Sequence, residues 1–149
     1  MLKEKLEADL TAALKAHDAI RKQTLRMALS AVTNEEKAGK QVRTLTDDEI
    51  IKVLTREAKK RREAAEAFES GGRAASAQAE RDEGAILEEY LPAQLSDEEL
   101  VAIVTAAVAE SGAEGPRQMG AVMKIVNPKV AGRAEGGRVA AEVKRQLSS

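Results

Sequence analysis

The stretch TDDEIIKVLTREAKKRREAAEAFESGG, residues 46–72, predicts one long amphipathic helix and points to an all-helical fold. Thr46 followed three residues later by Glu49 is a capping-box pattern, in which each residue binds the backbone N–H of the other. Apolar residues recur with a seven-residue rhythm at Ile51, Leu54, Ala58, Ala65 and Phe68. Because Gly71-Gly72 follows, we expect a helix of about 23 residues and about 35 Å.

Apolar residues at helical spacing predict further helices on both sides of this stretch. A first helix runs to about His17, and a second runs from Asp18 or Ala19 to Gly39, so the two form a helical hairpin. A fourth helix follows from about Ala74 to Tyr90, with Ala79, Ile86, Leu87 and Tyr90 as its buried residues. Leu91-Pro92 ends it, because proline clashes with a continuing helix.

Three more helices follow the proline. Ser96 and Glu99 repeat the capping box and begin a helix that Gly112 closes. Pro116 suits the first turn of the next helix, which Pro128-Lys129-Val130 stops, and Gly136-Gly137 leads into the last one. The sequence therefore predicts an all-α protein with a four-helix N-terminal domain, residues 1–92, and a three-helix C-terminal domain, residues 96–149.

The composition agrees with helices that pack through small aliphatic faces. Hydrophobic residues make up 43% of the 149 residues, and Phe68 and Tyr90 are the only aromatic ones. The absence of cysteine excludes disulfides, thiolate nucleophiles and cysteine-ligated metal sites, and no other pattern predicts a metal or a cofactor. No apolar run approaches the roughly 20 residues that span a bilayer, and charged residues interrupt the start of the chain, so we expect a cytoplasmic protein.

A net charge of −1 conceals a strong segregation of charge along the chain. Residues 80–114 contain ten acidic residues and one base, whereas residues 117–149 contain seven bases and two acids. Such asymmetry concerns the choice of partners and not the fold.

The basic C-terminal helices are the predicted nucleic-acid-binding site. Arginine can pair with a phosphate through its planar fork and lysine as a point charge, and the nearby glycines let a backbone approach closely. The candidate contacts are Lys124, Lys129, Arg133, Arg138, Lys144 and Arg145. The alternative interpretation is a solvated helix surface on which Gly132 and Gly136 serve only as turn and cap.

A second basic tract lies on the long helix, where residues 52–62 hold six bases and one acid. Lys59 and Arg62 are the candidate contacts there. A solvated face is the favoured alternative, because Glu63 and Glu66 are spaced for intrahelical ion pairs with these bases. Both tracts lack aromatic residues that stack on bases, which favours recognition of folded RNA through its backbone or shape.

No candidate catalytic centre emerges from the sequence. His17 is the only histidine and has no nucleophile or metal-ligand partner at a suitable spacing, so we interpret it as a helix-end residue. The acidic pairs Asp47-Asp48 and Asp97-Glu98 fall in helix first turns, where negative charge is favourable. A phosphate-binding Gly-x-x-x-x-Gly-Lys loop and a serine–lysine amidase signature are also missing, so we expect no independent catalysis.

The order of these motifs resembles the GatB/YqeY family, in which this chain is similar to the free-standing YqeY-like members. The matching segments are Arg26-Met27-Ala28-Leu29-Ser30-Ala31, Leu45-Thr46-Asp47-Asp48-Glu49, Tyr90-Leu91-Pro92-Ala93-Gln94-Leu95-Ser96, Met119-Gly120, Pro128-Lys129-Val130 and Gly132-Arg133-Ala134. They span nearly the whole chain.

The resemblance implies a relation to the C-terminal region of the B subunit of tRNA-dependent amidotransferase, a tRNA-holding appendage of the enzyme that amidates Glu-tRNA(Gln) or Asp-tRNA(Asn). It implies tRNA as the partner and a non-catalytic role. The family-level label of carbon–nitrogen ligase activity with glutamine as amido-N-donor belongs to a catalytic domain without a counterpart in this sequence. The alternative is a protein-interaction adaptor for an amidotransferase subunit or an aminoacyl-tRNA synthetase, docking through residues 80–114 or the long helix.

Overall fold

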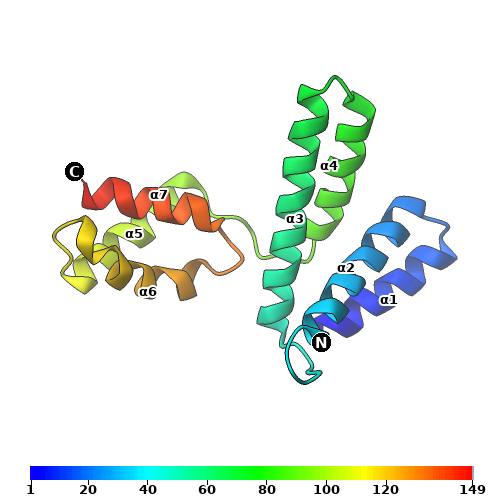
Figure 1. The fold of residues 1–149 in the computed structure, drawn as a ribbon, viewed down its shortest axis with the longest axis horizontal. Helices are drawn as coiled ribbons and strands as arrows, with labels where there is room; N and C mark the ends of the chain where they lie inside the picture. Colours follow the sequence, from blue (N-terminus) through cyan, green and yellow to red (C-terminus); the bar gives the residue numbers. More distant parts are fainter. Residues whose placement is uncertain (149) are drawn as a thin grey trace. The chain divides into compact units, whose positions relative to one another are not determined.

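The computed structural model describes residues 1–148, which form seven α-helices and one 3₁₀ turn without a β-strand (Figure 1). The predicted all-α fold is therefore confirmed. Contacts within the chain divide it into an N-terminal unit, Met1–Leu91, and a C-terminal unit from Pro92 onward. None of the helices in the described part combines the length and the apolar character needed to cross a bilayer.

Two helical hairpins make up the N-terminal unit. One consists of α1 (Leu2–Lys15) and α2 (Ala19–Lys37), and the other of α3 (Asp47–Ser70) and α4 (Ala74–Glu88). Figure 1 shows the hairpins leaning apart towards their turns. They share one core, whose fully buried side chains include Leu6, Leu25, Leu54 and Leu87.

The turns of both hairpins are made by residues in the left-handed conformation. His17 has a φ of 55°, and the N–H of Asp18 donates to Ala13 O at 3.0 Å, as in a Schellman cap. Gly72, with a φ of 75°, ends α3 in the same way. The interpretation of His17 as a helix-end residue is confirmed.

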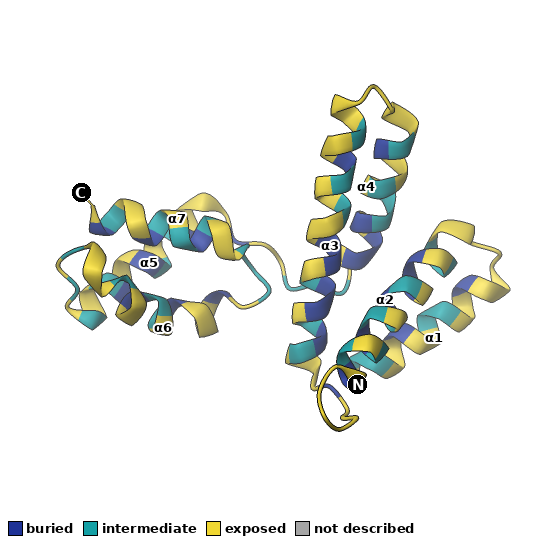
Figure 2. Cartoon of the chain, viewed as in Figure 1, coloured by how far each residue is buried: buried dark blue, intermediate teal, exposed yellow. Residues whose placement is uncertain are grey.

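The buried stripe of α3 differs from the predicted one. Ile51 and Phe68 are only half-buried, and the buried residues are instead Ile50, Val53, Leu54, Glu57, Ala58 and Ala65 (Figure 2). The buried residues from Ile50 to Ala58 follow the i, i+3, i+4, i+7, i+8 spacing of one helix face, and Ile51 lies at the edge of that face. On α4, the predicted core residue Ala79 is exposed, and Ala77 is buried in its place.

The C-terminal unit packs α5 (Asp97–Ser111), η1 (Pro116–Gln118), α6 (Met119–Val130) and α7 (Gly136–Leu147) around a separate core. Valine dominates this core, in which Val104, Val122, Val126 and Val143 are fully buried. Both predicted capping boxes form, with Thr46 Oγ1 accepting from Glu49 N at 3.2 Å and Ser96 Oγ accepting from Glu99 N at 3.1 Å.

One proline prediction was wrong, because Pro116 begins a separate 3₁₀ turn and not the first turn of α6. The predicted stop at Pro128-Lys129-Val130 is confirmed, since α6 ends at Val130, although Pro128 itself lies within the last turn. A proline in the last turn removes one helical hydrogen bond, while Val126 and Val130 on either side of it are buried in the core and hold the turn in place. The chain reverses after Val130 at Gly132, whose φ is 74°.

Candidate nucleic-acid interface

Arg133 and Arg138 hold the segment that leads into α5. Arg138 Nη2 donates to Leu95 O at 3.1 Å and to Asp97 Oδ1 at 2.9 Å. Arg133 Nε donates to Ala93 O at 3.4 Å, and Arg133 O accepts from Leu95 N at 2.7 Å. Both arginines therefore have a structural role. Arg133 makes its bond through Nε alone, and a guanidinium carries four further N–H donors on its terminal nitrogens.

Lys129 and Arg145 are paired with carboxylates of their own unit. Lys129 Nζ lies 3.8 Å from Glu110 Oε2 on α5. Arg145 Nη2 lies 2.6 Å from Glu142 Oε2 within α7, and this contact holds the pKa of Glu142 below its usual range. Each of these two bases would have to give up its carboxylate partner before it could bind a phosphate.

Lys124 and Lys144 remain exposed and have no hydrogen bond or ion pair to any of residues 1–148. Successive helical residues are about 100° apart, so Lys124 lies about 140° around α6 from Lys129, which faces α5. By the same geometry Lys144 lies about 160° around α7 from Gln146, whose side chain donates to Val101 O of α5 at 3.2 Å. Both lysines therefore point away from α5, on what we call the α6–α7 face.

The α6–α7 face has low relief. Gly120 and Gly137 lie on it within one or two turns of the lysines, and a Cβ placed on either glycine would meet no atom within 4 Å. Helix α6 contains no acidic residue, and the only one within α7, Glu142, is held by Arg145 and Gln146. A phosphate backbone could thus approach the two ammonium groups without meeting an unpaired carboxylate of these two helices.

Arg117 was not among the predicted contacts. It lies on η1, exposed, two turns before Lys124, and makes no hydrogen bond or ion pair to the described residues. The signal available in the sequence was its place as the first of the seven bases in residues 117–149.

The basic tract of α3 is largely neutralised by neighbouring carboxylates. Lys59 Nζ lies 3.9 Å from Glu63 Oε1, as the spacing predicted, and Arg62 Nη1 lies 3.6 Å from Glu88 Oε1 of α4. Arg61, only 21% exposed, lies 3.4 Å from Glu80 and 3.5 Å from Glu83. The tract is therefore a weaker candidate for binding RNA than the α6–α7 face.

The chain matches a known protein family. The family model described as Yqey-like protein covers residues 3–147, nearly the whole length. The chain belongs to the YqeY-like family. A search of curated proteins finds no match.

Both aromatic residues of this YqeY-like chain are engaged within the N-terminal unit. The Tyr90 hydroxyl donates to Asp9 Oδ2 at 2.5 Å, and the Arg73 guanidinium lies 5.3 Å from the centroid of the Phe68 ring. A base that stacked on the face of the Phe68 ring that Arg73 covers would have to displace its guanidinium.

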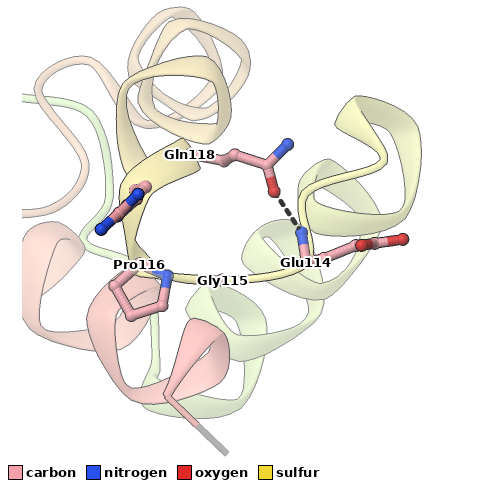
Figure 3. Close-up of a pocket in the computed structure, with 5 residues that line it drawn as sticks. Glu114, Gly115, Pro116 and Gln118 are labelled. Atoms are coloured by element: carbon pink, nitrogen blue, oxygen red, sulfur yellow. Dashed lines mark hydrogen bonds between the residues drawn. The ribbon is translucent and has the colours of Figure 1, made fainter.

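A hollow of about 520 Å³ at residues 114–118 of this YqeY-like chain is open to solvent, and Glu114 N donates to Gln118 Oε1 at 2.6 Å beside it (Figure 3). Its lining offers one carboxylate, that of Glu114, and no serine, cysteine or histidine. Residues 1–148 also contain no group of three or more His, Asp or Glu side chains that could hold a metal ion.

Proposed function

We propose that this YqeY-like chain is a tRNA-binding accessory protein that contacts the ribose-phosphate backbone through the α6–α7 face. The observation that carries the proposal is the position of Lys124 and Lys144, which have no partner among residues 1–148 and point away from α5 on helices whose one carboxylate is already bound. Arg133 adds guanidinium donors at the turn between the two helices, and Arg117 adds a cation before α6.

Folded RNA is the class of nucleic acid that this surface fits. These four cations on a glycine-bearing surface provide charge but no aromatic platform, so they suit a duplex or a compact fold better than a splayed single strand. The choice of tRNA rests on the resemblance to the appendage of the amidotransferase B subunit. The proposed role is to hold tRNA and not to transfer an amide group.

The test is the salt dependence of tRNA binding by the full-length chain, measured by fluorescence anisotropy with labelled tRNA. Affinity should fall steeply as salt rises, and the double variant Lys124→Ala, Lys144→Ala should weaken binding and reduce the logarithmic salt slope by about 2, near 1 for each lost phosphate contact. The matched control is Lys52→Ala, which removes an exposed and unpaired lysine from α3.

Two outcomes contradict the proposal. One is undetectable binding at about 100 mM salt, where several phosphate contacts normally suffice for association. The other is the same loss of affinity per removed lysine in Lys52→Ala and in the α6–α7 variant, which would mean that only net charge matters.

The adaptor hypothesis remains the alternative, but several carboxylates of its acidic segment are already paired. Glu80, Glu83 and Glu88 face arginines of α3, and Glu89 accepts two hydrogen bonds from Arg21. A partner held by this segment would have to displace those arginines.

A further inference from the structure

A groove between α2 and α4 is a second candidate binding surface, separate in residues and in chemistry from the α6–α7 face. It has a volume of about 450 Å³, within the range of small-molecule and side-chain pockets. Its lining consists of Ile20, Gln23, Ala75, Gln78, Ala79, Asp82 and Glu83. It lies where the α1–α2 and α3–α4 hairpins lean apart (Figure 1).

The floor of the groove is apolar and uncovered. Ile20 is 48% exposed, although it belongs to a residue type that is usually buried. Ala75 and Ala79 are also exposed, one turn apart on α4, and their small side chains would let another backbone come close. Gln23 and Gln78 provide amides that can bind main-chain or side-chain groups of an occupant.

The rim of the groove is acidic. Asp82 accepts a hydrogen bond from Gln78 at 2.9 Å and has no ion pair with the described residues. Glu83 lies 3.5 Å from Arg61, which it shares with Glu57 and Glu80. No lysine or arginine lines the groove. A phosphate backbone would be repelled there, whereas a cationic partner would be attracted.

We propose that the α2–α4 groove binds an amphipathic helix of a partner protein, which inserts aliphatic side chains between Ile20 and Ala79 and places lysine or arginine beside Asp82. A space between two helices that diverge is filled well by a third helix, whose ridges pack into the grooves of its neighbours. Recognition of this kind uses side chains at positions i, i+3, i+4 and i+7. The proposal does not depend on tRNA binding by the α6–α7 face.

The experiment uses the full-length chain and a labelled synthetic peptide of about 18 residues, or five helical turns, with leucine at i, i+3, i+4 and i+7 and lysine at the other positions. A second peptide replaces each lysine with glutamate. Anisotropy should detect binding of the leucine–lysine peptide only. Ile20→Gln should weaken it about tenfold, because about half of an isoleucine side chain becomes buried in the complex, and Ala79→Phe should do the same by filling the groove.

Matched controls distinguish binding in the groove from non-specific binding to the protein surface. Val42→Gln removes another exposed aliphatic side chain, 75% exposed in the segment between α2 and α3, and Glu66→Lys reverses an exposed charge on α3. Neither should change peptide affinity. Ile20→Gln should also leave tRNA binding unchanged, so that a failure of this proposal is distinguishable from a failure of the proposed function.

Amide chemical-shift mapping gives a second measurement if a variant is poorly folded. Shifts in the unaltered chain should concentrate on the lining residues of α2 and α4. The proposal is overturned by shifts spread over all acidic surfaces, by equal binding of both peptides, or by equal effects of Ile20→Gln and Val42→Gln. It is also overturned if sedimentation shows that Ile20→Gln dissociates a dimer, because the occupant is then a second copy of the chain.

Discussion

The guanidinium of Arg138 donates to the main-chain oxygen of Leu95 at 3.1 Å, 43 residues away along the chain. Leu95 is buried, and its N–H donates in turn to Arg133 O at 2.7 Å. The backbone polar groups of Leu95 are thus satisfied by Arg133, in the segment that joins α6 to α7, and by Arg138 of α7. A buried carbonyl that loses its partner is costly, so Arg138 matters for the integrity of the C-terminal unit whatever its role in binding.

Arg138→Ala should lower the free energy of unfolding by about 1–2 kcal/mol, because the Leu95 carbonyl loses a charged donor. The ion pair with Asp97 should add little, since that carboxylate is 94% exposed. Urea denaturation followed by circular dichroism measures the change. Arg145→Ala is the control, because its partner Glu142 lies on the same helix. Equal stability losses in the two variants would contradict this assignment.

Local signals in the sequence were sufficient for most of the fold. The capping boxes at Thr46 and Ser96 and the glycine pair after α3 fix their helix ends through contacts within a few residues, so they were predictable. The inclusion of Pro128 in the last turn of α6 was less predictable, because burial of Val126 and Val130 in a tertiary core offsets the preference of proline against helix. The shifted stripe of α3 also depends on packing against other helices.

The candidate site was less predictable, because the partners of its bases are remote in sequence. Arg133 and Arg138 were predicted as phosphate contacts from their charge, yet their hydrogen-bond acceptors lie near residues 93–97, about 40 positions earlier. Lys129 likewise pairs with a carboxylate of another helix. Helical periodicity gives the direction of a side chain on its own helix, but only the packing shows what it meets there.

The ion pair between Lys3 and Glu36 should make stability depend on pH. Lys3 Nζ lies 2.9 Å from the nearly buried Glu36 carboxylate, which also accepts from Leu45 N at 3.4 Å. The bond from Lys3 is the main cause that lowers the pKa of Glu36 below its usual 4.5, and it raises the pKa of Lys3 above 10.5. The unfolded chain then binds more protons than the folded one as the pH falls below about 4.5.

The stabilisation from Glu36 should therefore be complete at neutral pH and disappear as the solution is acidified through the lowered pKa. The stabilisation from Lys3 is lost instead at alkaline pH, as the pH rises above the usual lysine pKa of 10.5. Urea denaturation of the unaltered chain and of Glu36→Gln should differ at pH 7 and converge towards pH 3. A difference in the free energy of unfolding that stays constant from pH 7 to pH 3 would contradict the prediction. The exposed control Glu66→Gln should show such a constant difference.

The two capping boxes should contribute similar local stability to different helices. Ser96→Ala and Thr46→Ala each remove the acceptor for an N3 backbone N–H and should cost about 1 kcal/mol, whereas Ser96→Gly should cost only a few tenths. Amide hydrogen exchange should show faster exchange in the first turn of α5 for Ser96→Ala and in that of α3 for Thr46→Ala. Unchanged protection in those turns would show that the caps are replaced by water.

Tyr90 should titrate well above an ordinary tyrosine. Burial is the main cause that raises the pKa of its hydroxyl above 10, and its hydrogen bond to Asp9 Oδ2 is the second. Because Tyr90 is the only tyrosine and the chain has no tryptophan, ultraviolet absorbance of phenolate reports this one group. The unfolded chain loses the proton first, so the hydroxyl's contribution to stability should fall as the pH rises above about 10.

Asp9→Asn removes the carboxylate but not the burial, so the apparent pKa of Tyr90 in this variant should lie between that in the unaltered chain and that in the chain unfolded by urea. A midpoint near 10 in the folded, unaltered chain would mean that the hydroxyl faces water and that the contact between α1 and the end of α4 does not form.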